Sequence, residues 1–167
     1  GSACLRYLLR EGHDAYAYDS LRDGNRGAVP DADKRLIVGD LLDREMLKKT
    51  FAEHKFDAVM HFAAVASVPD SIADPADYWE VNVVGTKNVL DAMREAKVNN
   101  LVFSSTAATY AFTDVMPITE ASVQQPETPY GTTKLACETM IEEYRNAYGL
   151  GYTIMRYFNA SGADEDG

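Results

Sequence analysis

Several features that would mark a special class of protein are scarce in this chain. Only two of its 167 residues are cysteines, Cys4 and Cys137. Two cysteines are too few for a disulfide framework or a zinc site, and their apolar neighbours favour small buried side chains. No apolar run approaches the roughly 18 residues that a membrane span requires. We therefore expect no metal site, no membrane partner and, by default, a cytoplasmic location.

Basic residues are also outnumbered. The 16 Lys and Arg residues stand against 26 Asp and Glu, which gives a net charge of −10. A nucleic-acid-binding protein needs a basic stripe to displace counterions from phosphates. The basic residues of the 22–35 segment are scattered along one loop instead. We expect no nucleic-acid partner.

The overall composition is typical of a globular protein, with 46% hydrophobic and 25% charged residues. The length fits one domain. Short β-rich runs alternate with longer helical patterns, which predicts an α/β fold with a Rossmann-type, doubly wound parallel sheet. We expect strands at 14–18, 35–38, 56–62, 101–104 and 152–158. We expect the main helices at 3–10, 43–54, 78–96 and 130–148.

The helix predicted at 130–148 divides into two faces. Its apolar stripe consists of Cys137, Met140, Ile141, Tyr144 and Tyr148. We expect Glu138, Glu142 and Glu143 to turn largely to water.

Ligands of open α/β sheets bind at the carboxyl ends of the strands. Asp19 ends the first predicted strand, 18 positions after Gly1. That separation is close to the spacing of about 20 between a dinucleotide fingerprint and the carboxylate that holds the adenosine ribose. The carboxylate favours NAD over NADP, although Arg22 and Arg26 keep NADP open. Two alternatives stay open: Asp19 as a simple loop cap, and Gly1-Ser2 as the remnant of an expression tag.

Tyr130 and Lys134 form the strongest candidate pair. Four residues apart on a helix, they share one face. A phenol with an unperturbed pKa near 10 becomes a useful base when a nearby cation stabilises the phenolate. An ammonium one turn away, together with an oxidised nicotinamide ring, would lower the pKa of Tyr130 for proton transfer from a sugar hydroxyl. By itself the pair is weak evidence for a catalytic site, since a tyrosine and a lysine at this spacing are common on amphipathic helices.

The neighbourhood of the pair adds weight. Ser104-Ser105-Thr106 leaves the fourth strand with hydroxyls that can donate to and accept from a reacting oxygen. A plain Ser/Thr turn is the alternative interpretation. Pro129 suits the first turn of the helix that carries Tyr130.

Together these residues resemble the extended short-chain dehydrogenase/reductase family, and within it the UDP-glucose 4-epimerase branch. The likeness covers essentially the whole chain. The segments that carry it are Gly12-His13, Asp19-Ser20-Leu21, Gly39-Asp40-Leu41, His61 to Ala64, Asn82 to Thr86, Phe103 to Tyr110, Pro129 to Lys134 and Arg156 to Ala163.

The resemblance implies NAD as the cofactor and a UDP-sugar as the substrate. Tyr130 would be the catalytic base, Lys134 would hold the nicotinamide ribose and tune Tyr130, and Thr106 would bind the sugar 4-hydroxyl. Asn159 would reach the nucleotide sugar. The remaining residues implied to bind the cofactor are Gly1, Asp19, Asp40, Leu41, Phe62, Ala63, Ala64, Asn82, Ser104 and Phe158.

The reaction implied is a redox-neutral inversion at C4 of the sugar, in a protein that forms a homodimer at full length. Three alternatives remain: an epimerase of another UDP-sugar, a nucleotide-sugar 4,6-dehydratase, and a non-catalytic dinucleotide-sensing protein. Dehydratases of this group resemble one another in an Asp-Glu pair where this chain has Ala107-Ala108.

The sequence finally predicts an incomplete domain. In the dinucleotide-binding strand order 3-2-1-4-5-6, the first strand is central, and the resemblance begins after it. We expect residues 1–167 to be a truncated NAD-binding Rossmann domain, with two half-sheets and without the C-terminal substrate-binding portion. We also expect it not to fold stably alone.

Overall fold

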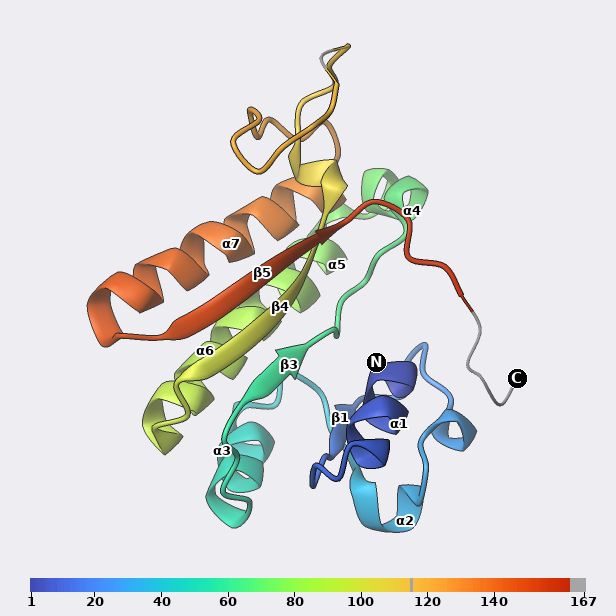
Figure 1. Cartoon of the computed structure of the whole chain (residues 1–167), viewed down its shortest axis with the longest axis vertical. Helices are drawn as coiled ribbons and strands as arrows, with labels where there is room; N and C mark the ends of the chain where they lie inside the picture. Colours follow the sequence, from blue (N-terminus) through green and yellow to red (C-terminus); the bar gives the residue numbers. More distant parts are fainter. Residues whose placement is uncertain (115, 163–167) are drawn as a thin grey trace.

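The computed structural model describes residues 1–114 and 116–162 (Figure 1). Every strand pairing in this part of the chain is parallel. The strands are β1 (Ala17–Asp19), β2 (Leu36–Val38), β3 (Val59–His61), β4 (Asn100–Thr106) and β5 (Gly151–Tyr157). They form two sheets, one of order β1-β2 and one of order β3-β4-β5. The predicted parallel α/β fold and its two half-sheets are confirmed.

Helices separate the strands throughout. They are α1 (Ser2–Arg10), α2 (Ala32–Arg35), α3 (Arg44–Glu53), α4 (Val68–Ala73), α5 (Pro75–Tyr78), α6 (Gly85–Ala96) and α7 (Pro129–Tyr148), with the short turns η1 (Arg26–Ala28) and η3 (Ala107–Thr109). A π-helical turn, η2 (Trp79–Val84), joins α5 to α6, so the helix predicted at 78–96 is not one regular helix. No helix among the described residues is both long and apolar enough to cross a membrane.

The predicted strands 14–18 and 56–62 are longer than the observed β1 and β3. Each of these strands pairs along one edge only, β1 with β2 and β3 with β4. The ladder between β1 and β2 runs only from Ala17 and Leu36 to Asp19 and Val38. The apolar pattern therefore overestimates their length, because pairing as well as polarity decides where a strand ends.

The main core lies between the larger sheet and the helices α3, α6 and α7. Met93, Phe103 and Ile141 are 0% exposed, and they come from α6, β4 and α7 respectively. Met60 of β3 points to the opposite face, where the Sγ atom of Cys4 on α1 lies 3.7 Å from its sulfur. Helices therefore contact both faces of the strands, as the doubly wound interpretation predicts.

Helix α7 begins as predicted, but one of its faces is not as predicted. The Thr128 side chain caps it by accepting a hydrogen bond from the Gly131 amide at 3.1 Å. Glu138 is only 5% exposed, so the prediction that it faces water is wrong. Tyr148, assigned to the apolar stripe, is 53% exposed, because the end of α7 extends beyond the core.

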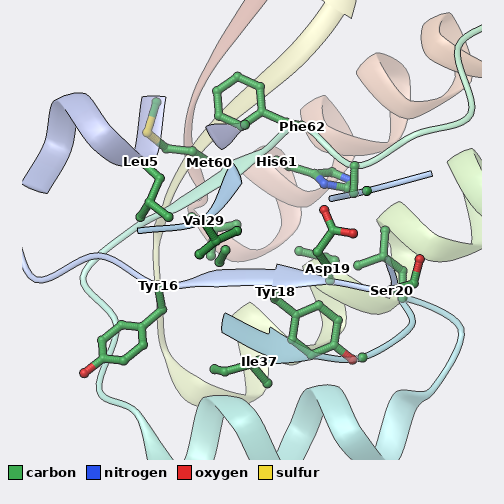
Figure 2. Close-up of a pocket in the computed structure, with 18 of the residues that line it drawn as sticks. Leu5, Tyr16, Tyr18, Asp19, Ser20, Val29, Ile37, Met60, His61 and Phe62 are labelled. Atoms are coloured by element: carbon green, nitrogen blue, oxygen red, sulfur yellow. The ribbon is translucent and has the colours of Figure 1, made fainter. Parts of the chain in front are cut away.

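A cavity of about 520 Å³ lies between the two sheets. Its walls come from β1 on one side and β3 on the other, together with apolar residues of α1 and α3 such as Leu5, Leu8 and Phe51. Figure 2 shows Leu5, Met60 and Asp19 arranged around this space. The unpaired edges of β1 and β3 therefore face a largely apolar gap.

Candidate active site

The carboxyl ends of β1 and β3 meet at one side of the cavity. Most residues that the sequence assigned to the cofactor lie there. The cavity is lined by Gly1, Asp19, Asp40, Leu41, Phe62, Ala63 and Ala64. Within the described residues, no group of three or more His, Cys, Asp or Glu side chains is arranged to hold a metal ion.

Asp19 is both a loop cap and a cavity residue. Its Oδ1 atom accepts a hydrogen bond from the Leu21 amide at 2.8 Å, and Leu21 adopts a left-handed φ of 59°. A Cβ atom on Gly24 would lie 2.7 Å from the same oxygen, so a larger residue there would require the Asp19 side chain to move. In Figure 2 the Asp19 side chain points away from Tyr18 of the same strand and from Tyr16, which lies just before β1. The loop cap and the cavity position are therefore compatible.

The end of β2 is fixed by Tyr18. Its hydroxyl donates to the Asp40 carbonyl at 2.9 Å, and its ring leaves no room for a Cβ atom on Gly39. Burial, with the charges of Asp43 and Asp40, raises the pKa of Tyr18 to about 12. The phenol therefore stays a neutral donor that positions Asp40 and Leu41 at the cavity.

Tyr130 and Thr106 lie close together. Thr106 ends β4 and Tyr130 lies in the first turn of α7, near enough for Thr106 to affect the pKa of the phenol. Gly131 allows this approach, because a Cβ atom there would collide with the Ala108 carbonyl. The Thr106 hydroxyl also accepts from the Ala108 amide at 3.1 Å. The sequence therefore places a phenol and a hydroxyl at the end of the central strand of the larger sheet.

The ammonium of Lys134 is held by a backbone carbonyl and an aromatic ring, and its action on Tyr130 stays a prediction. Its Nζ atom donates to the Ser104 carbonyl at 2.7 Å and lies 4.7 Å from the centre of the Phe103 ring. Burial raises the pKa of Tyr130, and the hydrogen bond with Thr106 lowers it by less. A lower phenol pKa therefore requires a further positive charge at the site.

Lys134 itself is 3% exposed. Burial lowers its pKa to about 8, against an opposite effect from Cys137 and Glu138. The ammonium is therefore mostly protonated at pH 7 and is held by a backbone carbonyl. Such a buried, oriented cation is suited to hydrogen bonding with a ligand hydroxyl.

Asn82 lies in η2 and is 2% exposed. Its side-chain amide makes two hydrogen bonds with the Val65 backbone. The Oδ1 atom accepts from the Val65 nitrogen at 2.9 Å, and the Nδ2 atom donates to the Val65 carbonyl at 3.0 Å. It also donates to the Thr133 hydroxyl at 3.3 Å. Asn82 thus joins the loop after β3 to α7, and any contact with a cofactor would be made through that loop.

Phe158 and Asn159 follow β5 at the same end of the larger sheet. Phe158 is 61% exposed and Asn159 is also exposed. The resemblance implies a cofactor contact for Phe158 and a nucleotide-sugar contact for Asn159. Both stay predictions.

Glu138 belongs to a buried polar cluster that the sequence did not reveal. Its carboxylate accepts from Arg156 at 2.7 Å, from Gln124 at 2.9 Å and from the Ser105 hydroxyl. Arg156 also donates to the Tyr110 hydroxyl at 2.8 Å. The cluster ties the ends of β4 and β5 to α7. The pairing depends on tertiary contact between distant segments, so helical periodicity alone gave no signal for it.

His61 is a second buried polar group outside the predicted set. Its Nε2 atom lies 2.9 Å from the Thr86 hydroxyl, and Cys137 donates to the same hydroxyl at 3.6 Å. Burial, and then the positive charge of Lys134, lowers the pKa of His61 to about 3. The imidazole is therefore neutral at physiological pH.

This burial predicts an acid-dependent loss of stability. Below the ordinary His pKa of 6.5, the unfolded chain takes up a proton at His61 and the folded chain does not, down to about pH 3. The unfolded state then binds more protons, so the free energy of unfolding falls as the pH falls, by at most about 1.4 kcal/mol per pH unit. We expect urea unfolding of the whole protein to show this decline from pH 6.5 to 5. In His61→Gln the curve should be flatter, and parallel curves for the two proteins would contradict the assignment.

The arginines that kept NADP open are both paired. Arg26 donates to Asp33 at 2.6 Å. Arg22 donates to both carboxylate oxygens of Asp77, each at 2.8 Å. The acidic Asp19 therefore lies at the cavity while the nearby guanidinium groups are held by other carboxylates, which favours NAD.

The donor set fits a dinucleotide. Gly1 caps α1, and the open amides of a helix N-terminus suit a pyrophosphate. Ala63 and Ala64 leave space along the loop after β3, and Asp19 offers a carboxylate to ribose hydroxyls. The bound group would add hydride acceptance and return, which no side chain supplies.

Fold and cavity together define a dinucleotide-binding protein of the α/β class, and the comparisons with known proteins agree. The model of the NAD dependent epimerase/dehydratase family matches residues 1–167. The chain therefore belongs to the NAD-dependent epimerase/dehydratase family.

The individual relatives that the chain resembles are named as epimerases of UDP-sugars. A UDP-glucose 4-epimerase of Corynebacterium glutamicum is 49% identical over 163 residues, which are 98% of this chain and 49% of that protein. The crystal structure of UDP-glucose 4-epimerase from Brucella ovis in complex with NAD is 44% identical, with a TM-score of 0.96 over 100% of this chain and 51% of that one. The UDP-Glc/GlcNAc 4-epimerase of Campylobacter jejuni is 36% identical, with a TM-score of 0.92 over 99% of this chain and 52% of that one. The chain spans about half the length of the curated relatives that it matches.

Proposed function

We propose that the whole protein interconverts UDP-glucose and UDP-galactose by transient oxidation at C4, with NAD bound throughout. The observation that carries the proposal is the placement of Tyr130 beside Thr106 at the end of β4, with Lys134 bound to the neighbouring Ser104 carbonyl. The relatives named as UDP-glucose 4-epimerases support the choice of sugar.

The chain's own residues account for the proton transfers. Thr106 orients the sugar 4-hydroxyl, and Tyr130 removes its proton as the C4 hydrogen leaves as hydride. NAD bound at the cavity would accept this hydride and return it, and its positive ring would lower the pKa of Tyr130. Tyr130 would return the proton to the 4-oxygen once the 4-keto sugar has turned over and hydride has come back to its other face. No net oxidation results.

The alternative functions differ at specific positions. A 4,6-dehydratase needs an acid and a base to eliminate water across C5 and C6, and Ala107 and Ala108 of η3 supply neither. A non-catalytic sensor has no need of a tyrosine placed beside Thr106 with a lysine on the same helix. An epimerase of N-acetylated sugars remains as a second candidate, since the Campylobacter relative is named for both UDP-Glc and UDP-GlcNAc.

A product assay tests the proposal. We expect the whole protein to convert UDP-galactose into UDP-glucose without added NADH. A 4-keto-6-deoxy sugar as the product would establish a dehydratase, and no conversion of any UDP-sugar would contradict the proposal. A parallel assay with UDP-N-acetylglucosamine decides the range of sugars.

We also propose that residues 1–167 are a truncated NAD-binding Rossmann domain, whose gap between β1 and β3 is filled by a further strand in the whole protein. The support is the cavity of about 520 Å³ between two unpaired strand edges. Unpaired edges with apolar walls make an isolated unit unstable. We expect residues 1–167 expressed alone to lack a cooperative thermal transition. A cooperative transition in the isolated segment would contradict this.

The remaining proposals concern the partner and the compartment. We propose a homodimer for the whole protein, supported by large apolar side chains that α4 and η2 expose, Ile72 at 66% and Trp79 at 44%. A cytoplasmic location is supported by the free thiols of Cys4 and Cys137.

A further inference from the structure

The bidentate ion pair between Arg22 and Asp77 joins segments 55 positions apart. Arg22 belongs to the loop that closes around Asp19 and lines the cavity. Asp77 belongs to α5, in the connection between β3 and β4 of the larger sheet. The pair therefore connects the loop that begins at the proposed adenosine site to a helix of the other half of the domain.

The position of Arg22 would ordinarily suit a phosphate. A carboxylate that binds both ribose hydroxyls selects NAD, whereas an arginine close by accommodates the additional 2′-phosphate of NADP. Arg22 lies three residues after Asp19 in a tight loop, and its guanidinium group is the kind that binds phosphates with two parallel hydrogen bonds. A free Arg22 would work against the selectivity that Asp19 provides.

In this structure Asp77 takes both of the parallel hydrogen bonds that the Arg22 guanidinium group could donate to a phosphate. Both of its oxygens accept from Arg22, each at 2.8 Å. The hydrogen bond with Arg22 lowers the pKa of Asp77, so the carboxylate stays ionised at neutral pH. Asp23 is a second carboxylate within ion-pair distance among the described residues, with its Oδ2 atom 3.9 Å from the Arg22 Nε atom. Asp77 thus neutralises Arg22 and directs its donors toward α5.

We propose that Asp77 is a positioning residue for cofactor selectivity, which holds Arg22 in the ion pair so that the site does not accept a 2′-phosphate. Asp77 acts through Arg22 and does not itself touch the cofactor. The inference rests on the dinucleotide site and not on which sugar reacts, so it can fail or hold independently of the proposed epimerase activity.

Four variants of the whole protein test this proposal: Asp77→Asn, Asp77→Glu, Arg22→Ala and the double variant Arg22→Ala/Asp77→Asn. The measurement is equilibrium titration with NADH and with NADPH, followed by nicotinamide fluorescence. We expect Asp77→Asn to bind NADPH about tenfold more tightly than the unmodified protein, since a freed guanidinium forms charge-assisted hydrogen bonds. NADH affinity should change much less.

The controls separate selectivity from structural damage. Asp77→Glu keeps a carboxylate partner and should retain the original preference, and Arg22→Ala should gain no NADPH binding. The double variant should lose the gain of Asp77→Asn, although both lack the same carboxylate. Unchanged NADPH affinity in Asp77→Asn, or an equal gain in the double variant, would overturn the proposal. Circular dichroism of all four variants checks that they are folded.

Discussion

Replacing Tyr130 by phenylalanine should reduce the rate of UDP-sugar interconversion at least about a hundredfold, the usual scale for a positioned acid-base group. The change removes one hydroxyl and keeps the ring that lies 6.4 Å, centre to centre, from the Tyr78 ring. Packing at the start of α7 is therefore preserved, and the loss reports proton transfer. The measurement is the initial rate of product formation by the whole protein at saturating UDP-galactose.

Tyr148→Phe is a matched control for this experiment. Tyr148 lies at the far end of the same helix and is 53% exposed. Its hydroxyl is not part of the site, so we expect an unchanged rate. If Tyr130→Phe were as active as the unmodified protein, Tyr130 would not be the base.

Replacing Glu138 by alanine should cause the largest loss of stability among single changes in α7. The substitution leaves Arg156 without its carboxylate, and Ser105 and Gln124 without their acceptor. Removing one partner of a buried ion pair costs about 3–5 kcal/mol. The free energy of unfolding of the whole protein in urea measures this directly.

Glu142→Ala provides the comparison, since Glu142 is an exposed residue one turn along the same helix. Surface substitutions of this kind usually change stability by less than about 0.5 kcal/mol. A similar small effect for Glu138→Ala would show that the cluster around Arg156 does not stabilise the fold. Glu138→Gln, which keeps hydrogen-bonding atoms but no charge, should lie between the two.

These two predictions also show what the sequence could and could not provide. Tyr130 and Thr106 were predictable because parallel strands and the helices that follow them place their ends at one edge of a sheet. Glu138 was assigned to water because helical periodicity describes one helix, whereas its partners Ser105 and Arg156 come from β4 and β5. Polar groups buried by tertiary pairing leave no trace in a local pattern.

The electrostatics of the site show the same limit. Spacing placed Lys134 on the Tyr130 face, but the Ser104 carbonyl binds its ammonium, and burial raises the pKa of the phenol. The ion pair of Arg22 and Asp77 was equally invisible, since 55 positions separate its partners. By contrast, the division into two half-sheets was predictable, because the order of motifs along the chain fixes the order of strands.

The central claim is that the hydrogen removed from C4 of the sugar returns to the same carbon while Tyr130 moves only the hydroxyl proton. The most direct measurement uses UDP-galactose carrying deuterium at C4, turned over by the whole protein in ordinary water and examined by NMR. The account predicts UDP-glucose with deuterium retained at C4. Deuterium lost to the solvent would contradict it, and so would deuterium transferred to C6.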